Sequence, residues 1–315
     1  MFNKVKYTLI GNPLPNEMMA EKRLNKVRAL AAFSPDALSS VAYANQEIFL
    51  GLAVAGAAGL RLQLPIALAI TLLLGVVSLS YAQTIRGYPS GGGSYIVARE
   101  NLWVYPGLVD GAALLLDYIF TAAFSLTAWV AAIASACPDL WPYRVPIALG
   151  LLALITVLNL RGLRESGTTM AAPVYLFIFS FVGMILFGLV RAAAQGVPTA
   201  LVTSAPPAAE PLSLFLIMHA FSAGCTALTG IEAISNGIPS FEPPEWVNAR
   251  KTMIFMAILM GFMFLGSMGL TQFFGIVAAP DETILSALAR HIFGSGVGYY
   301  LVQVATLAVL AVAAT

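Results

Sequence analysis

The sequence is poor in charged residues, in cysteine and in histidine. Only 10% of its 315 residues are charged, against about 25% in soluble domains, and 59% are hydrophobic. A chain that exposes this much apolar surface requires lipid as its solvent. Two distant cysteines give no disulfide framework or metal-ligand spacing, and the basic residues are too dispersed for a nucleic-acid surface. There is no nucleophile–base pair or cofactor motif, so we do not expect an enzyme.

Long apolar runs occupy most of the chain. Eight segments approach the roughly 20 residues that a bilayer demands, and we place them at 29–55, 63–86, 106–135, 145–160, 172–194, 212–238, 252–278 and 293–315. The first 28 residues are polar and basic, with no cleavable signal peptide. We therefore expect four parts: a cytoplasmic segment (1–28), a first five-helix repeat (29–194), an extracellular loop (195–211) and the start of a second repeat (212–315).

Lysine and arginine predict the orientation. With the N-terminus inside, twelve of the 16 basic residues fall on the inner side, and the bias holds from loop to loop. Positive charge in short loops favours the cytoplasm. We therefore expect a multi-pass protein of the cell membrane with a cytoplasmic N-terminus.

The stretch FSPDALSSVAYANQE, residues 33–47, lies in the first apolar segment but is rich in polar groups. A carboxylate at the centre of a span costs about 3 kcal/mol, so it is tolerated where it faces a polar cavity or an ion path. Pro35 lacks an N–H and predicts a helix break just before Asp36. Polar side chains at spacings of four, three and four share one helical face: Asp36, Ser40, Tyr43 and Glu47. We interpret this face as half of a cation site; a proline-kinked span with acids near the membrane surface is the alternative.

The third segment, GLVDGAALLLDYIFTAAFSLTAW, carries a second polar face. Tyr118 lies beside two carboxylates and two hydroxyls on this face: Asp110, Asp117, Thr121 and Ser125. Asp117 lies deep in the span, whereas Asp110 is near the cytoplasmic end and is expected to be solvated. Serine and threonine often hydrogen-bond their own helix backbone, but the shared face with Asp117 favours a role as ligands.

The sixth segment, MHAFSAGCTALTGIEAISNGIPSF, is interrupted by Gly224, Gly230 and Gly237. Each glycine weakens a helix by about 1 kcal/mol relative to alanine, which predicts a second unwound helix beside Thr229 and Glu232. Interrupted first and sixth spans are typical of a five-plus-five inverted repeat with its site at the midplane. Small residues also permit close helix packing, but packing does not explain the glutamate.

The loop GYPSGGGSYIVARE follows the second segment. It lacks the lysine and the strand–helix setting of a phosphate-binding loop. We interpret it as a tight cytoplasmic turn whose glycines permit positive φ.

Four motifs carry a resemblance to a known family: FSPDALSSVAYANQE, YPSGGGSYIVARE, LDYIFTAAFSLTAW and CTALTGIEAISNG. The chain resembles the amino acid–polyamine–organocation (APC) superfamily, in particular its potassium–proton symporter branch of the KimA type, related to the KUP permeases. The resemblance implies an all-α membrane protein with an APC/LeuT-like inverted-repeat fold and discontinuous first and sixth helices. Of the family's roughly twelve spans, eight are expected here, so we expect a C-terminally truncated chain.

The same resemblance implies an ion path. Its positions match Asp36, Tyr43, Asp117, Tyr118, Thr121, Ser125 and Thr229, and potassium is expected at Asp36, Tyr43, Asp117, Thr121 and Ser125. Glu232 matches a candidate proton-coupling position. Oxygen ligands of this kind suit an alkali ion that sheds water. A substrate carboxylate would be repelled by Asp36 in a low-dielectric site.

These observations predict a secondary active transporter, with proton-coupled potassium uptake as the leading interpretation. An amino acid or amine permease in which Asp36 holds an ammonium group is the alternative, and a non-transporting fragment is a further one. No cofactor is expected beyond the transported potassium and protons. The expected partners are the lipid bilayer and a small cation, amino acid or amine; a homodimer is possible, and nucleic acid is not expected.

Overall fold

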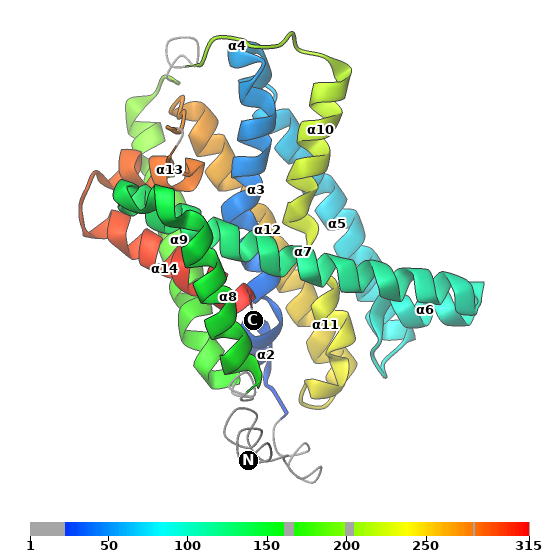
Figure 1. Cartoon of the computed structure of the whole chain (residues 1–315). Coiled ribbons are helices and arrows are strands. Elements are labelled where there is room, and N and C mark those ends of the chain that lie inside the picture. Colours follow the sequence, from blue (N-terminus) through cyan, green and yellow to red (C-terminus); the bar gives the residue numbers. More distant parts are fainter. Residues whose placement is uncertain (1–22, 161–166, 199–204, 280, 315) are drawn as a thin grey trace.

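The computed structural model describes residues 23–160, 167–198, 205–279 and 281–314, and this part of the chain is all-helical (Figure 1). The α-helices are α2 (Lys26–Phe33), α3 (Pro35–Ala53), α4 (Gly56–Leu60), α5 (Gln63–Gly87), α6 (Gly93–Leu102), α7 (Val104–Ala136), α8 (Arg144–Leu160), α9 (Gly167–Gln195), α10 (Leu214–Gly224), α11 (Glu232–Asn236), α12 (Glu245–Phe273), α13 (Ile284–Phe293) and α14 (Val297–Ala313). Short 3₁₀ helices are η2 (Pro138–Tyr143), η5 (Cys225–Leu228) and η6 (Ile238–Ser240). Most of the predicted N-terminal segment, two inner arginines (Arg161 and Arg164) and residues 199–204 of the predicted outer loop lie outside the described residues.

Within the described ranges, six segments are long and apolar enough to cross a membrane: Gly56–Gly87, Val104–Ala136, Asp139–Val157, Met170–Gln195, Leu214–Asn236 and Glu245–Phe273. They correspond to the second to seventh predicted segments, so the chain is a multi-pass membrane protein. The prediction of eight spans is not confirmed. The first predicted segment is divided between α2 and α3 and contains acids, and α14 has 17 residues, whereas a span needs about 20.

The first apolar segment is interrupted at one residue, Ser34. The Ser34 N–H donates to the Leu30 carbonyl at 2.9 Å, and the Leu38 N–H donates to the Ser34 carbonyl at 2.8 Å. Pro35 is the first residue of α3, where its missing N–H and fixed φ are tolerated. Ser34 therefore ends α2 and begins α3, and the second helix follows the first without a loop.

The sixth segment is interrupted over a longer stretch. α10 ends at Gly224, η5 follows, and α11 begins only at Glu232. Between them Thr229 is extended (φ −65°, ψ 151°) and Gly230 has a φ of +76°. The chain thus changes direction here, although its role as a discontinuous transport helix stays a prediction.

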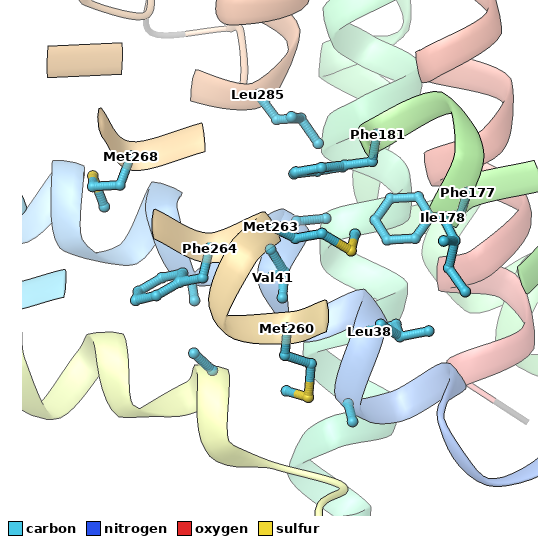
Figure 2. Close-up of a cluster of buried hydrophobic side chains, with 14 of the residues drawn as sticks. Leu38, Val41, Phe177, Ile178, Phe181, Met260, Met263, Phe264, Met268 and Leu285 are labelled. Atoms are coloured by element: carbon cyan, nitrogen blue, oxygen red, sulfur yellow. The ribbon is translucent and has the colours of Figure 1, made fainter. Parts of the chain in front are cut away.

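A buried apolar cluster fixes one side of α3 (Figure 2). Its side chains come from α3, α9, α12 and α13: Leu38, Val41, Phe177, Ile178, Phe181, Met260, Met263, Phe264, Met268 and Leu285. Flexible methionines from α12 fill the irregular space between these helices. The core therefore holds α3 centrally, while α7 crosses the bundle and contacts both α3 and α14 (Figure 1).

The glycine-rich loop is shorter than the sequence predicts. Gly91, Gly92 and Gly93 have φ values of +85°, +98° and +53°, which confirms the predicted positive φ. Helix α6 begins at Gly93, so only the first part of the stretch is a turn. Asp110, expected to be solvated, accepts a hydrogen bond from Ser94 Oγ of α6 at 2.9 Å. The additional helix supplies this partner.

Candidate functional site

The interruption of the sixth segment lies directly against Asp36 of the first. A Cβ added to Gly230 would lie 2.8 Å from both Cγ and Oδ2 of Asp36 and 2.6 Å from the Ala37 nitrogen. Thr229 Oγ1 lies 3.5 Å from Asp36 Oδ1. Glycine is required here for space as well as for its positive φ. The backbone of one interrupted segment therefore covers the carboxylate of the other.

Tyr43, two turns further along α3, lies at the junction of three elements. Its ring stacks on Phe124 of α7, with centroids 6.1 Å apart and planes inclined by 14°. Its hydroxyl interacts with Thr229, and the side chain is 6% exposed. Tyr43 thus joins α3, α7 and the sixth segment. Ser40, predicted on the same face, instead donates to the Ala37 carbonyl at 2.7 Å.

Two hydroxyls of α7 are buried without a hydrogen-bond partner. Thr121 Oγ1 and Ser125 Oγ have none among the described residues. On the same helix Thr127 donates to the Phe124 carbonyl at 2.9 Å, and Ser135 donates to the Ala131 carbonyl at 2.8 Å. Buried polar groups normally have partners. Thr121 and Ser125 therefore offer oxygens that the described part of the chain does not use.

Asp117 brings a second carboxylate close to the tyrosines. Asp36 and Asp117 each interact electrostatically with Tyr43 and with Tyr118. Within the described ranges, no three His, Cys, Asp or Glu side chains group together to hold a metal ion. A bound cation would therefore depend on single carboxylates together with hydroxyl and carbonyl oxygens.

Glu232, the first residue of α11, is 6% exposed. The Tyr118 hydroxyl interacts with the Glu232 carboxylate, whose Oε1 has no hydrogen-bond partner in the described part of the chain. Asn236 Nδ2 donates to the Tyr118 oxygen at 3.2 Å. Asn236 was not predicted from the sequence, although its position four residues after Glu232 places both on one helical face.

A cavity of about 680 Å³ leads away from Tyr43. It lies between α3, α7, the start of α8, α14 and the segment before α13, and its lining includes Tyr43, Glu47, Phe124, Trp141, Arg144 and Glu282. Glu47 is the last acid of the predicted polar face of α3. It therefore lines this cavity and takes no part in the contact between Asp36 and Gly230. Tyr43 is shared by the cavity and the polar centre.

Contacts and electrostatic interactions thus connect six of the predicted site residues: Asp36, Tyr43, Asp117, Tyr118, Thr229 and Glu232. Thr121 and Ser125 follow Asp117 along α7 but make no hydrogen bond to Asp36. Their shared face agrees with the spacing in the sequence. Their function as ligands stays a prediction.

Apolar helices around a partly buried polar centre have the architecture of a membrane permease. The chain belongs to the amino acid permease family, whose sequence pattern matches residues 25–315. It is 45% identical over 315 residues to the potassium transporter KimA of Bacillus subtilis (strain 168), covering 100% of this chain and 52% of KimA.

More distant relatives are the low-affinity putrescine importers PlaP of Escherichia coli strains K12 and O157:H7. Each is 26% identical over 189 residues, which is 59% of this chain and 40% of PlaP. The chain spans about half the length of the curated relatives that it matches.

Proposed function

We propose that the chain belongs to a secondary active transporter that takes up potassium together with protons. The cation binds where α3 meets α7 and the sixth segment. In this proposal α2–α3 and α10–α11 are the discontinuous first and sixth helices of an inverted repeat. The observation that carries the proposal is the Asp36 carboxylate held beside Thr229 and the Gly230 backbone, in a chain 45% identical to a potassium transporter.

The chemistry of the polar centre favours a bare cation. Asp36 supplies negative charge where low dielectric makes it effective, and the same charge repels a substrate carboxylate. Thr121 and Ser125 present hydroxyl oxygens without other partners. An alkali ion that loses its hydration shell needs oxygen ligands of this kind. Tyr43 and Asp117 complete the proposed set.

The cavity next to Tyr43 is the proposed entry route. With the N-terminus in the cytoplasm, α3 runs outward, so that Glu47 and the cavity lie on the outer side of Asp36. Glu47, Asp281 and Glu282 line this route together with Arg144, and Glu282 is ion-paired with Arg290 at 3.1 Å. Acidic side chains along a narrow route raise the local concentration of cations.

Glu232 is the proposed proton carrier. It is buried next to Tyr118, and it interacts electrostatically with Asp117. Ionisable residues inside membrane segments commonly serve proton relays. A proton on Glu232 therefore affects the cation site through Tyr118 and Asp117.

A second candidate function is amine uptake. The similarity to the putrescine importer PlaP favours it, because an organic ammonium group also requires a carboxylate such as Asp36. The cavity of about 680 Å³ has room for a small diamine.

The test is growth of a potassium-uptake-deficient bacterium at limiting potassium. The 315-residue chain is expressed alone and as a chimera extended by the remaining part of B. subtilis KimA. Rescue by either form, lost in Asp36→Asn at equal membrane content, supports potassium uptake. If neither form rescues growth and saturable putrescine uptake is measured, the proposed substrate is an amine and not potassium.

A further inference from the structure

We infer that Asn236 is a positioning residue that keeps the Tyr118 hydroxyl proton directed at Glu232, and that the glycine turn at residues 91–93 holds Asn236 in place. The inference rests on the proposed function, and it identifies what controls the proposed proton carrier. Asn236 and Tyr118 are 118 residues apart in sequence, so their contact exists only in the folded protein.

The direction of the hydrogen bonds follows from the donors available. A tyrosine hydroxyl has one proton, and an amide nitrogen of asparagine donates but does not accept. Asn236 Nδ2 lies 3.2 Å from the Tyr118 oxygen, so the tyrosine accepts in that bond. Its own proton is then available to the neighbouring Glu232 carboxylate, whose buried Oε1 has no partner among the described residues.

The glycine turn determines which way the amide of Asn236 points. A Cβ on Gly93 would lie 2.2 Å from Asn236 Oδ1, and one on Gly91 would lie 3.0 Å from the Asn236 carbonyl oxygen. Both glycines have positive φ. The turn therefore packs directly on the oxygen side of Asn236 and leaves the nitrogen facing Tyr118. Side chains on the turn would displace Asn236.

Few other groups compete for Glu232. The titratable groups that interact with it are Asp117 and Tyr118 from α7 and Tyr81 from α5; Asp36 acts on Tyr118 in turn. A hydrogen bond donated by Tyr118 favours the charged form of the carboxylate. When Asn236 no longer donates to Tyr118, the hydroxyl proton is free to turn away from Glu232. Glu232 then keeps its proton to higher pH.

The experiment compares Asn236→Leu, Tyr118→Phe and the double variant in the transporting form identified above. Rubidium uptake is measured as a function of external pH and cation concentration. Loss of one positioned hydrogen bond predicts that Asn236→Leu lowers the maximal uptake rate about 10-fold. It also raises the pH of half-maximal uptake, while the KM for the cation changes much less.

The double variant separates positioning from packing. If Asn236 acts through the Tyr118 hydroxyl, Asn236→Leu has less than about a twofold further effect when residue 118 is phenylalanine, since coupled residues are not additive. A full, additive loss in the double variant would overturn the inference. An Asn236→Leu variant with an unchanged pH profile would also overturn it.

Gly93→Ala tests the turn independently. It is expected to reproduce the pH shift of Asn236→Leu, whereas Gly75→Ala, with nothing within 4 Å of the added Cβ, is the matched control.

If Asn236→Leu does not reach the membrane, Asn236→Asp keeps the size and removes the donor. If the wild type transports putrescine and not rubidium, the same comparison is made with putrescine. Failure of the proposed substrate is then distinct from failure of the Asn236 inference.

Discussion

The interruptions of the first and sixth segments are built differently. In the first segment, only Ser34 between α2 and α3 is non-helical, and it takes part in backbone hydrogen bonds of 2.9 Å and 2.8 Å to the turns on either side. Between Gly224 and Glu232 the α-helix is lost over seven residues, one of them glycine with a φ of +76°. Proline at a first helical position lets a helix restart at once, whereas positive φ redirects the backbone.

This difference assigns separate tasks to the two regions. The first interruption presents the Asp36 side chain from the first turn of α3. The second presents backbone and the Thr229 hydroxyl, because only its path leaves the helix axis. The first interruption therefore supplies a charged side chain, and the second supplies backbone that packs closely against it. Their contact is the centre of the proposed site.

The largest expected effect comes from removing the charge in the first region. Asp36→Asn keeps the shape of the side chain but removes the proposed counter-charge of the cation. Loss of a buried charge partner costs about 2–5 kcal/mol, which corresponds to at least about a 30-fold loss of uptake. Uptake is measured at equal membrane content. Wild-type rates in this variant would show that Asp36 is not part of the site.

Gly230→Ala tests the close approach from the second region. The added Cβ would lie 2.6–2.8 Å from atoms of Ala37 and Asp36, at a φ of +76°. Positive φ and overpacking together cost about 2–5 kcal/mol. Thermal unfolding in detergent should show this loss of stability, with uptake reduced as well. Gly269→Ala, which meets nothing within 4 Å, is the control.

Removal of the Thr121 or Ser125 hydroxyl is expected to weaken transport without lowering stability. Thr121→Val and Ser125→Ala remove oxygens proposed as ligands, so the apparent cation affinity should fall by up to about 10-fold each. Each also removes a buried polar group without a partner, so thermal stability should be unchanged or higher. Thr71→Val is the control, because Thr71 donates to the Ala67 carbonyl at 2.8 Å. Lower stability with unchanged uptake would contradict a ligand role.

Pro35→Ala gives the smallest expected effect. Because Pro35 takes the first position of α3, where no intrahelical N–H bond is made, alanine there should change the free energy of unfolding by less than about 1 kcal/mol. A loss of stability as large as that of Gly230→Ala would show that the first interruption depends on Pro35 as strongly as the second depends on Gly230. The comparison uses chemical denaturation of both variants in the same detergent.

Parts of the fold could be predicted because they depend on local sequence. The apolar runs predicted the helical, multi-pass class, and the triple glycine predicted the positive φ at Gly91–Gly93. Helix α6 was missed because turn residues dominate the stretch before it. The prediction of eight spans is not confirmed, since polar residues in α3 and the length of α14 depart from a simple span.

The candidate site, too, could be predicted only where it depends on local sequence. Spacing along α7 placed Asp117, Thr121 and Ser125 on one face, as helical period requires. It did not distinguish Thr121 and Ser125 from Thr127, because both kinds of hydroxyl have equal access to their own helix backbone. In the structure Thr127 donates to its own helix, whereas Thr121 and Ser125 have no partner among the described residues. Asn236 was missed because its partner, Tyr118, is 118 residues away in the sequence.

Composition and periodicity by themselves determined that this protein lies in a membrane, which segments are helical and which faces carry polar groups. These properties follow from the solvent and from the geometry of one helix. Tertiary structure decided that Asp36 lies under Gly230, that Tyr43 stacks on Phe124, and that Asn236 donates to Tyr118. These contacts join residues far apart in the chain, and they depend on how the helices pack around α3.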